Sequence, residues 1–113
     1  MVAGASASTA ASRLRLLADL ATSDLDAPYG GFHTEAAIRA WSRADEAASV
    51  VQARVDTRRL SYITSCFAAA GHADAPVRAQ LLLAAVVGAQ HLARTDPSSQ
   101  RTQLQLLVSL LLG

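Results

Sequence analysis

The spacing of apolar residues is the feature that most restricts what this chain can fold into. Apolar side chains recur at intervals of three and four positions in several stretches, as at Leu14, Leu17 and Leu20. That interval places them on one face of an α-helix, whereas a half-buried strand alternates every second residue. The sequence has no alternating run of Val, Ile, Thr or Tyr bounded by turns. We therefore expect an all-α fold.

Composition and charge narrow the class of protein further. The chain has 113 residues, enough for one domain with a buried core, and its commonest residues are Ala and Leu, both strong helix formers. A net charge of +1 provides no electrostatic basis for binding nucleic acid or an anionic membrane. The longest apolar run, residues 81–89, is shorter than the roughly 20 residues that cross a bilayer. A single cysteine excludes an internal disulfide, and we expect a cytoplasmic protein.

Turn-forming residues divide the chain into segments. A first helix is expected over residues 8–21 after a flexible start, followed by a loop rich in Asp, Pro and Gly over 22–33. Thr34 can act as the N-cap of a second helix that ends near residue 44, because its hydroxyl can accept a bond from a first-turn amide. Residues 1–33 therefore form one segment, and residues 34–113 form the main helical domain.

The later helices have clear start or stop signals. Asp45 can cap a third helix over about residues 46–70, and Gly71 can end that helix in a left-handed conformation. The fourth and fifth helices each begin with an acidic cap and a nearby proline, at Asp74 with Pro76 and at Asp96 with Pro97. A proline fits there because the first helical turn does not use its amide hydrogens. The sequence thus predicts an antiparallel bundle of about five helices, the last ending near residue 112.

The last two helices have apolar residues on more than one face. Residues 81–93 are apolar almost all round, and the leucines of the fifth helix fall on two neighbouring faces. Because a large exposed apolar patch is unusual on a soluble monomer, we expect these helices to pair with those of a second copy. The candidate interface residues are Leu83, Val86, Val87, Gln90, Leu104, Leu107, Val108 and Leu111. The alternative is that the two helices cover each other and the third helix within one chain.

No catalytic or metal-binding signature is present in the sequence. Cys66 lies on the apolar face of the third helix, where a structural cysteine is expected rather than a nucleophile with a nearby base. His33, His72 and His91 have no metal-ligand spacing with one another or with Cys66. Gly30–Gly31 lacks the further residues of a phosphate-binding loop. We therefore expect no enzyme activity, no metal and no cofactor.

A pocket for a small hydrophobic or amphipathic molecule is the kind of site that the sequence favours. Such pockets are mostly apolar with a few polar groups. On the third helix the expected apolar stripe is Val51, Val55, Tyr62, Cys66 and Ala70, widened by Ile63 and Phe67, with Gln52 on the opposite side. The candidate lining residues are Trp41, Tyr62, Cys66 and Phe67, with Arg39 or Arg59 as a polar anchor. The alternative for each of them is ordinary core packing, with the arginine heads reaching into solvent.

Three segments resemble the C-terminal domain of TetR-family transcriptional regulators, in the family's order and spacing. They are residues 38–45 (IRAWSRAD), residues 55–63 (VDTRRLSYI) followed by Phe67 and Gly71, and residues 78–88 (RAQLLLAAVVG). The resemblance implies an all-α domain over residues 34–113 that binds an effector among its helices. It also implies a two-fold dimer through the last two helices.

The family's DNA-reading helix-turn-helix has no counterpart in residues 1–34. A truncated gene product, a misplaced start codon and a natural short form all remain open. The resemblance thus implies the effector-sensing and dimerisation part of a transcriptional repressor. It would bind DNA only if a longer form supplied the helix-turn-helix. The alternative is a stand-alone helical module that forms homo- or heterodimers.

Overall fold

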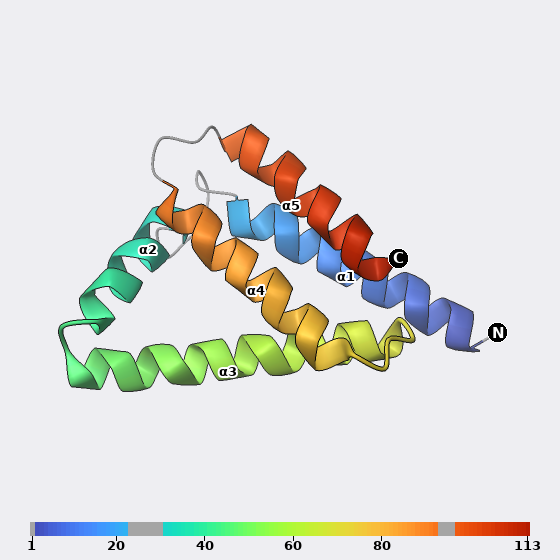
Figure 1. Ribbon diagram of the computed structural model, residues 1–113, viewed down its shortest axis with the longest axis horizontal. Helices are drawn as coiled ribbons and strands as arrows, with labels where there is room; N and C mark the ends of the chain where they lie inside the picture. Colours follow the sequence, from blue (N-terminus) through green and yellow to red (C-terminus); the bar gives the residue numbers. More distant parts are fainter. Residues whose placement is uncertain (1, 23–30, 93–96) are drawn as a thin grey trace.

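A computed structural model describes residues 2–22, 31–92 and 97–113, which are helical apart from short turns (Figure 1). The helices are α1 (Val2–Thr22), α2 (Gly31–Ser42), α3 (Glu46–Ala69), α4 (Ala75–His91) and α5 (Pro97–Leu112). The predicted all-α class and the five helices are therefore confirmed for this part of the chain. Within it, none of the helices has the length and hydrophobicity needed to cross a lipid bilayer.

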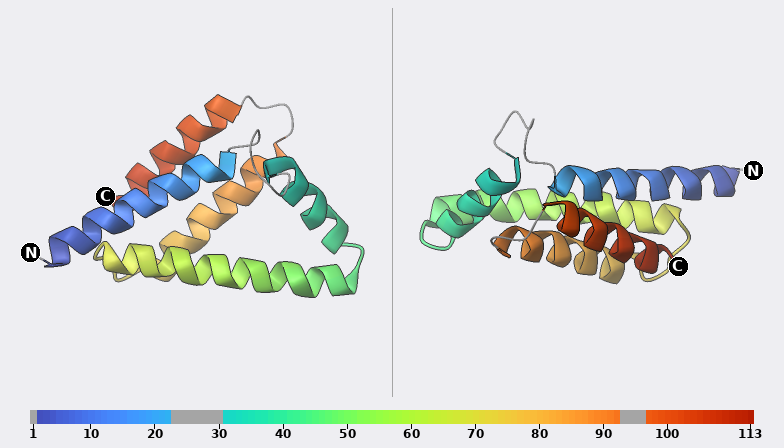
Figure 2. Two further views of the ribbon diagram at one scale, coloured as in Figure 1. Left: turned by 180° about the vertical axis from the view of Figure 1, so that it is seen from behind. Right: turned by 90° about the horizontal axis from the view of Figure 1, so that it is seen from above.

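The helices pack in two layers (Figures 1 and 2). α4 and α5 lie over α1 and α3, and α1 and α5 run side by side in opposite directions. α4 contacts both α3 and α5, so it connects the two sides of the bundle. α2 packs against α3 and also reaches α4. This arrangement brings the two ends of the sequence, α1 and α5, into one packed unit.

Local capping signals set the ends of α3 as predicted. Asp45 has an extended backbone (φ −128°), and its Oδ1 accepts a hydrogen bond from the Ala48 amide at 2.9 Å. At the other end Gly71 has φ +100°, a left-handed conformation that a side chain would strain. The His72 amide then donates to the Phe67 carbonyl at 3.1 Å, as in a Schellman motif.

Two helix starts differ from the predictions, and a third lies where it was predicted but lacks a cap bond. α1 begins at Val2 rather than at residue 8, because the Ala-rich stretch before residue 8 also favours a helix. α2 begins at Gly31, so Thr34 lies inside the helix and is not its N-cap. Gly is also tolerated at helix starts, so the residue types alone did not fix where the first turn of α2 begins. Asp74 does precede α4, but its carboxylate accepts from Arg78 Nε at 2.7 Å and makes no cap bond.

Two expected features fall in parts of the chain that are not described. Most of the expected loop over residues 22–33, namely residues 23–30, lies outside the described residues. The expected cap Asp96 lies outside them as well. Pro97 is the first residue of α5, and Pro76 lies in the first turn of α4, as predicted.

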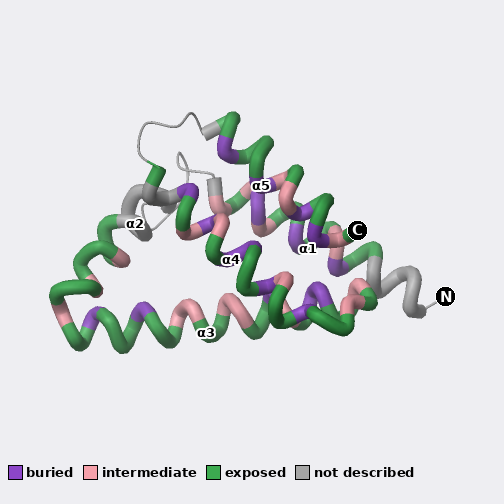
Figure 3. The backbone as a smooth tube through the Cα atoms, in the orientation of Figure 1, coloured by how far each residue is buried: buried purple, intermediate pink, exposed green. Residues whose placement is uncertain are grey.

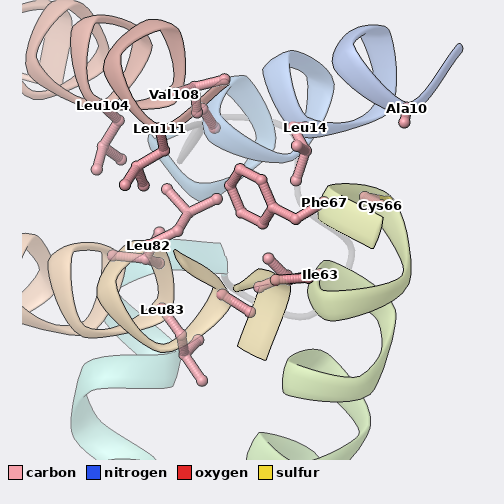
Figure 4. Packing of buried hydrophobic residues seen from close by; sticks show 14 residues of the cluster. Ala10, Leu14, Ile63, Cys66, Phe67, Leu82, Leu83, Leu104, Val108 and Leu111 are labelled. Atoms are coloured by element: carbon pink, nitrogen blue, oxygen red, sulfur yellow. The ribbon is translucent and has the colours of Figure 1, made fainter. Parts of the chain in front are cut away.

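The core lies where α1, α3, α4 and α5 meet around Phe67 (Figure 4). Phe67 is 0% exposed, as are Leu14 of α1, Leu82 of α4 and Val108 of α5. Burying a side chain of this size contributes about 1.5–3 kcal/mol relative to leaving it in water. Four helices therefore depend on one shared apolar centre.

The buried face of α3 is rotated from the predicted one. Ile63, Cys66 and Phe67 are buried as expected, but Val51 is 57% exposed and Gln52 is buried. The first half of α3 is mostly exposed (Figure 3), and the residues that α3 contributes to the core, Ile63, Cys66 and Phe67, all lie in its second half. α2 packs against α3 on the side of Asp56, where Arg39 of α2 donates to the carboxylate of Asp56.

Candidate functional site

A groove of about 380 Å³ opens between α1, α3 and α4, and its lining is mostly apolar. Its described lining residues are Leu17, Leu20 and Ala21 of α1, Arg58, Arg59, Tyr62 and Ile63 of α3, and Leu83 and Val86 of α4. The volume falls within the range of roughly 300–1,000 Å³ that is typical of small-molecule sites. An apolar hollow with a few polar groups on one wall suits a small amphipathic molecule.

Helical spacing explains how each wall forms. On α3, Arg58 and Tyr62 are one turn apart, so their side chains lie on one face of the helix. Leu17 and Leu20 on α1 follow the same rule, as do Leu83 and Val86 on α4. The apolar walls thus come from α1 and α4, and all three polar lining residues come from α3.

The polar wall is positively charged. Arg58 is exposed at the groove, whereas Arg59 is partly buried. Burial lowers the pKa of Arg59 below its usual value, and the guanidinium still carries its charge at neutral pH. Desolvation, followed by the neighbouring Cys66, raises the pKa of the Tyr62 hydroxyl, which is therefore protonated and able to donate at neutral pH. None of the described lining residues is acidic.

The structure separates the six residues that the sequence suggested for a pocket, of which Arg59 lines the groove as one of the two possible anchors. Tyr62 lines the groove. Cys66 and Phe67 belong to the buried apolar core, so the alternative interpretation, core packing, is confirmed for both. Trp41 lies on α2, is 58% exposed, and is not among the residues that line the groove. Arg39 is bound to Asp56.

The residues that the pocket prediction missed are Leu17, Leu20 and Ala21 of α1, Arg58 and Ile63 of α3, and Leu83 and Val86 of α4. Arg59 was named only as a possible anchor. The sequence did place Leu17 and Leu20 on a helical stripe. No local signal could show that this stripe lies against α3 and α4.

Arg39 joins α2 to α3. Its Nη1 and Nη2 donate to the two carboxylate oxygens of Asp56, each at 2.9 Å, and Gln52 Nε2 donates to Asp56 Oδ1 at 3.2 Å. The Arg39 and Asp56 side chains are 13% and 27% exposed. The hydrogen bonds from Arg39 are the main reason why the pKa of Asp56 lies below its usual 3.8. This geometry assigns Arg39 to the packing of α2.

Most of the candidate dimer residues lie inside one copy of the chain. The residues buried in the core are Leu83, Val86, Leu104, Val108 and Leu111. Val87 and Leu107 are partly buried against that core, and the side chain of Gln90 lies outside what the structure describes. The five core residues cannot also cover a partner in this fold, so a surface for a second copy must consist of other residues. The large exposed apolar residues on α4 and α5 are Val77, Leu81, Leu106 and Leu110.

The described residues contain no group of three or more His, Cys, Asp or Glu side chains that could hold a metal ion. Comparisons of the chain with protein-family models, with curated proteins and with solved structures found no match. Its function therefore has to be argued from the groove and from the exposed apolar residues.

Proposed function

We propose that this chain is an effector-binding domain that holds a small hydrophobic or amphipathic molecule in the groove between α1, α3 and α4. The groove itself, with its volume of about 380 Å³ and its apolar walls, is the observation that carries the proposal. The resemblance to the C-terminal domains of TetR-family regulators implies an effector at a comparable place, among the helices. The proposed role is binding in the cytoplasm rather than catalysis.

The arrangement of the groove suggests how binding could be sensed. Its lining comes from α1, α3 and α4, which also share the core around Phe67. A ligand that touches all three helices favours the conformation in which those contacts are best, and so shifts their relative positions. In a longer form with a helix-turn-helix, that shift would change the spacing of the two DNA-reading heads. This chain alone should not bind DNA, and a tight, salt-dependent gel shift with it would contradict the proposal.

Pairing with a second copy is the other half of the proposal. Leu106 and Leu110 are 60% and 65% exposed and stand one turn apart on α5. Val77 and Leu81 have the same relation on the neighbouring α4. A second copy that covers these four residues would form a two-fold contact between pairs of helices.

The same four residues also favour the second candidate, a stand-alone interaction module that forms homo- or heterodimers without a ligand. Genomic sequence upstream of Met1 separates the two candidates. An in-frame helix-turn-helix would favour the regulator, and a stop codon would favour the module.

The groove can be tested by isothermal titration calorimetry with decanoate, decanol and decylamine below their micelle-forming concentrations. We expect at least one of them to bind, and Ala21→Trp, which fills the groove, to abolish that binding. The matched control is Ala84→Trp at an exposed position on α4, which should bind as the unmodified chain does. Absence of binding by all three compounds, or unchanged binding in Ala21→Trp, would contradict effector binding in this groove.

Pairing can be tested by sedimentation velocity. We expect the unmodified chain to be a dimer, and the double variant Leu106→Glu/Leu110→Glu to be a monomer with the same helical circular dichroism signal. The matched control is Val50→Glu/Val51→Glu, because both valines are exposed on α3. A monomeric unmodified chain at high concentration would rule out pairing.

A further inference from the structure

We propose that an exposed face of α3 is a docking site for an acidic amphipathic helix of a partner protein. This face, which we call the outer face of α3, consists of Val50, Val51, Arg54 and Arg58. The four residues lie within about two turns, at spacings of three and four that place them on one side of the helix. The inference does not rest on the proposed effector binding, although Arg58 also borders the groove.

The apolar part of the outer face is open to solvent. Val50 and Val51 are 48% and 57% exposed, in the mostly exposed first half of α3 (Figure 3). Valine is a weaker helix former than alanine, because its branched side chain loses rotamer freedom in a helix. Local helix formation therefore does not account for two exposed valines at this place.

An open hollow of about 450 Å³ lies on the same side of α3. Its described lining residues are Val50, Ala53, Arg54, Thr57 and Arg58. An apolar side chain of a partner that enters this hollow removes valine surface from water. Two arginines border the same hollow, so the partner also brings its own charges close to theirs.

The charge of the outer face determines the sign of the partner. Arg54 and Arg58 are exposed one turn apart, and no ion pair joins either of them to another described residue. Asp56 lies on another side of α3, where both of its carboxylate oxygens accept hydrogen bonds from Arg39. Glu46, the other acidic residue of α3, lies two turns before Arg54, or about 12 Å along the helix. Two unopposed positive charges beside exposed valines therefore fit a partner that is acidic as well as apolar.

The small size of the outer face favours a protein helix over a membrane or a nucleic acid. Segments that bind anionic lipids typically have clusters of about four to eight basic residues, and binding to DNA needs several phosphate contacts. The outer face has two arginines, and the net charge of the chain is +1. A partner helix can meet both parts of the face, with apolar side chains at spacings of three and four against the valines and carboxylates against the arginines.

The test measures the binding of labelled helical peptides by fluorescence anisotropy, at concentrations where each peptide alone is monomeric. Each peptide has about 18 residues, or roughly 27 Å of helix, with leucine on one face and glutamate, glutamine or lysine on the other. We expect the glutamate peptide to bind most tightly and the lysine peptide least. Arg54→Gln should weaken the glutamate peptide by about two- to fivefold, which is the effect of one exposed ion pair. Arg101→Gln on α5, exposed and outside the outer face, is the matched control.

Reversing the charge separates an electrostatic contact from a general disturbance of α3. Arg54→Glu/Arg58→Glu should bind the lysine peptide more tightly than the glutamate peptide, with an unchanged circular dichroism signal. Should this double variant unfold, Arg54→Glu replaces it and must narrow the difference between the two peptides. Ala21→Trp, which fills the groove, should leave the binding of the glutamate peptide unchanged.

Four results would overturn the proposal. The glutamate peptide does not bind, or the charge-reversed variant keeps its preference for glutamate. Loss of peptide binding in Ala21→Trp would place the peptide in the groove instead of on the outer face. Finally, phosphatidylserine vesicles or a DNA duplex could bind more tightly than the peptide and lose that binding in Arg54→Gln, which would assign the outer face to a membrane or to nucleic acid.

Discussion

The two halves of α3 are held in place by different kinds of interaction. In the second half, Ile63, Cys66 and Phe67 enter the apolar core that α1, α4 and α5 share. The first half is mostly exposed (Figure 3). Its Val50 and Val51 are exposed, and the Arg39–Asp56 pair joins it to α2. The C-terminal half of α3 is thus held by the apolar core, and its N-terminal half is joined to α2 by a polar contact.

The comparison shows how stability is distributed in the molecule. Apolar burial has no required direction and grows with the area covered, so the second half of α3 should unfold only with the whole bundle. A charge-assisted pair depends on geometry and on the ionisation of its partners, and it joins only two helices. We therefore expect α2 to open locally, at lower cost than global unfolding.

Truncation at the core should have the largest effect. Phe67→Ala removes a fully buried ring shared by four helices and should lower the free energy of unfolding by about 3–5 kcal/mol. Urea denaturation followed by circular dichroism measures the change. Trp41→Ala at the exposed end of α2 is the control, and it should cost about 1 kcal/mol or less. Equal losses in the free energy of unfolding for Phe67→Ala and Trp41→Ala would contradict the contrast between the apolar core and the region around α2.

Removing the Arg39–Asp56 pair should release α2 without unfolding the bundle. Arg39→Gln should weaken the attachment of α2 by about 1–3 kcal/mol, since the hydrogen bonds to a partly buried carboxylate are lost. Hydrogen exchange should then speed up at the amides of α2 and stay unchanged in α4 and α5. Arg43→Gln, exposed in the turn after α2, is the matched control. A uniform increase in exchange over all helices would show that α2 and the core unfold together.

Acid should weaken the same pair. The pKa of Asp56 is lowered in the folded chain, so its contribution to stability is fully present above the unfolded value of about 3.8. That contribution is lost as the pH falls through the pKa that Asp56 has in the folded chain. We expect the exchange protection of α2 to be constant from neutral pH to about pH 5 and to decline below about pH 4. In Asp56→Asn this decline should be absent from α2, and its persistence would assign the acid sensitivity to other groups.

The smallest predicted effect concerns the end of α5. Arg78 Nη1 donates to the Leu111 carbonyl, and His72 Nε2 lies 3.2 Å from the Leu112 carbonyl, so two residues near the start of α4 hold the last turn of α5. Arg78→Gln should cost about 0.5–1.5 kcal/mol by thermal unfolding. Arg54→Gln, at an exposed position of α3, is the control. A loss as large as that of Phe67→Ala would mean that α5 docks through this contact rather than through the core.

The sequence predicted the ends of α3 correctly, but not its buried face, and it predicted only part of the groove. Asp45 and Gly71 were correctly predicted as the cap and the stop of α3, because each acts on amides and carbonyls within a few residues of itself. Val51 and Gln52 were placed on the wrong sides, since α2 covers a polar flank of α3. Of the site, the prediction included Tyr62 and named Arg59 as a possible anchor.

The sequence alone determined the helical class, the helix count and most of the helix ends, because helical periodicity and capping are local properties of the backbone. Only the tertiary structure decided which apolar faces are buried and where the groove opens. It also decided that Arg39 meets Asp56, although the two are 17 residues apart. Those outcomes depend on how helices distant along the chain lie against one another, and apolar burial by itself sets no direction for that packing.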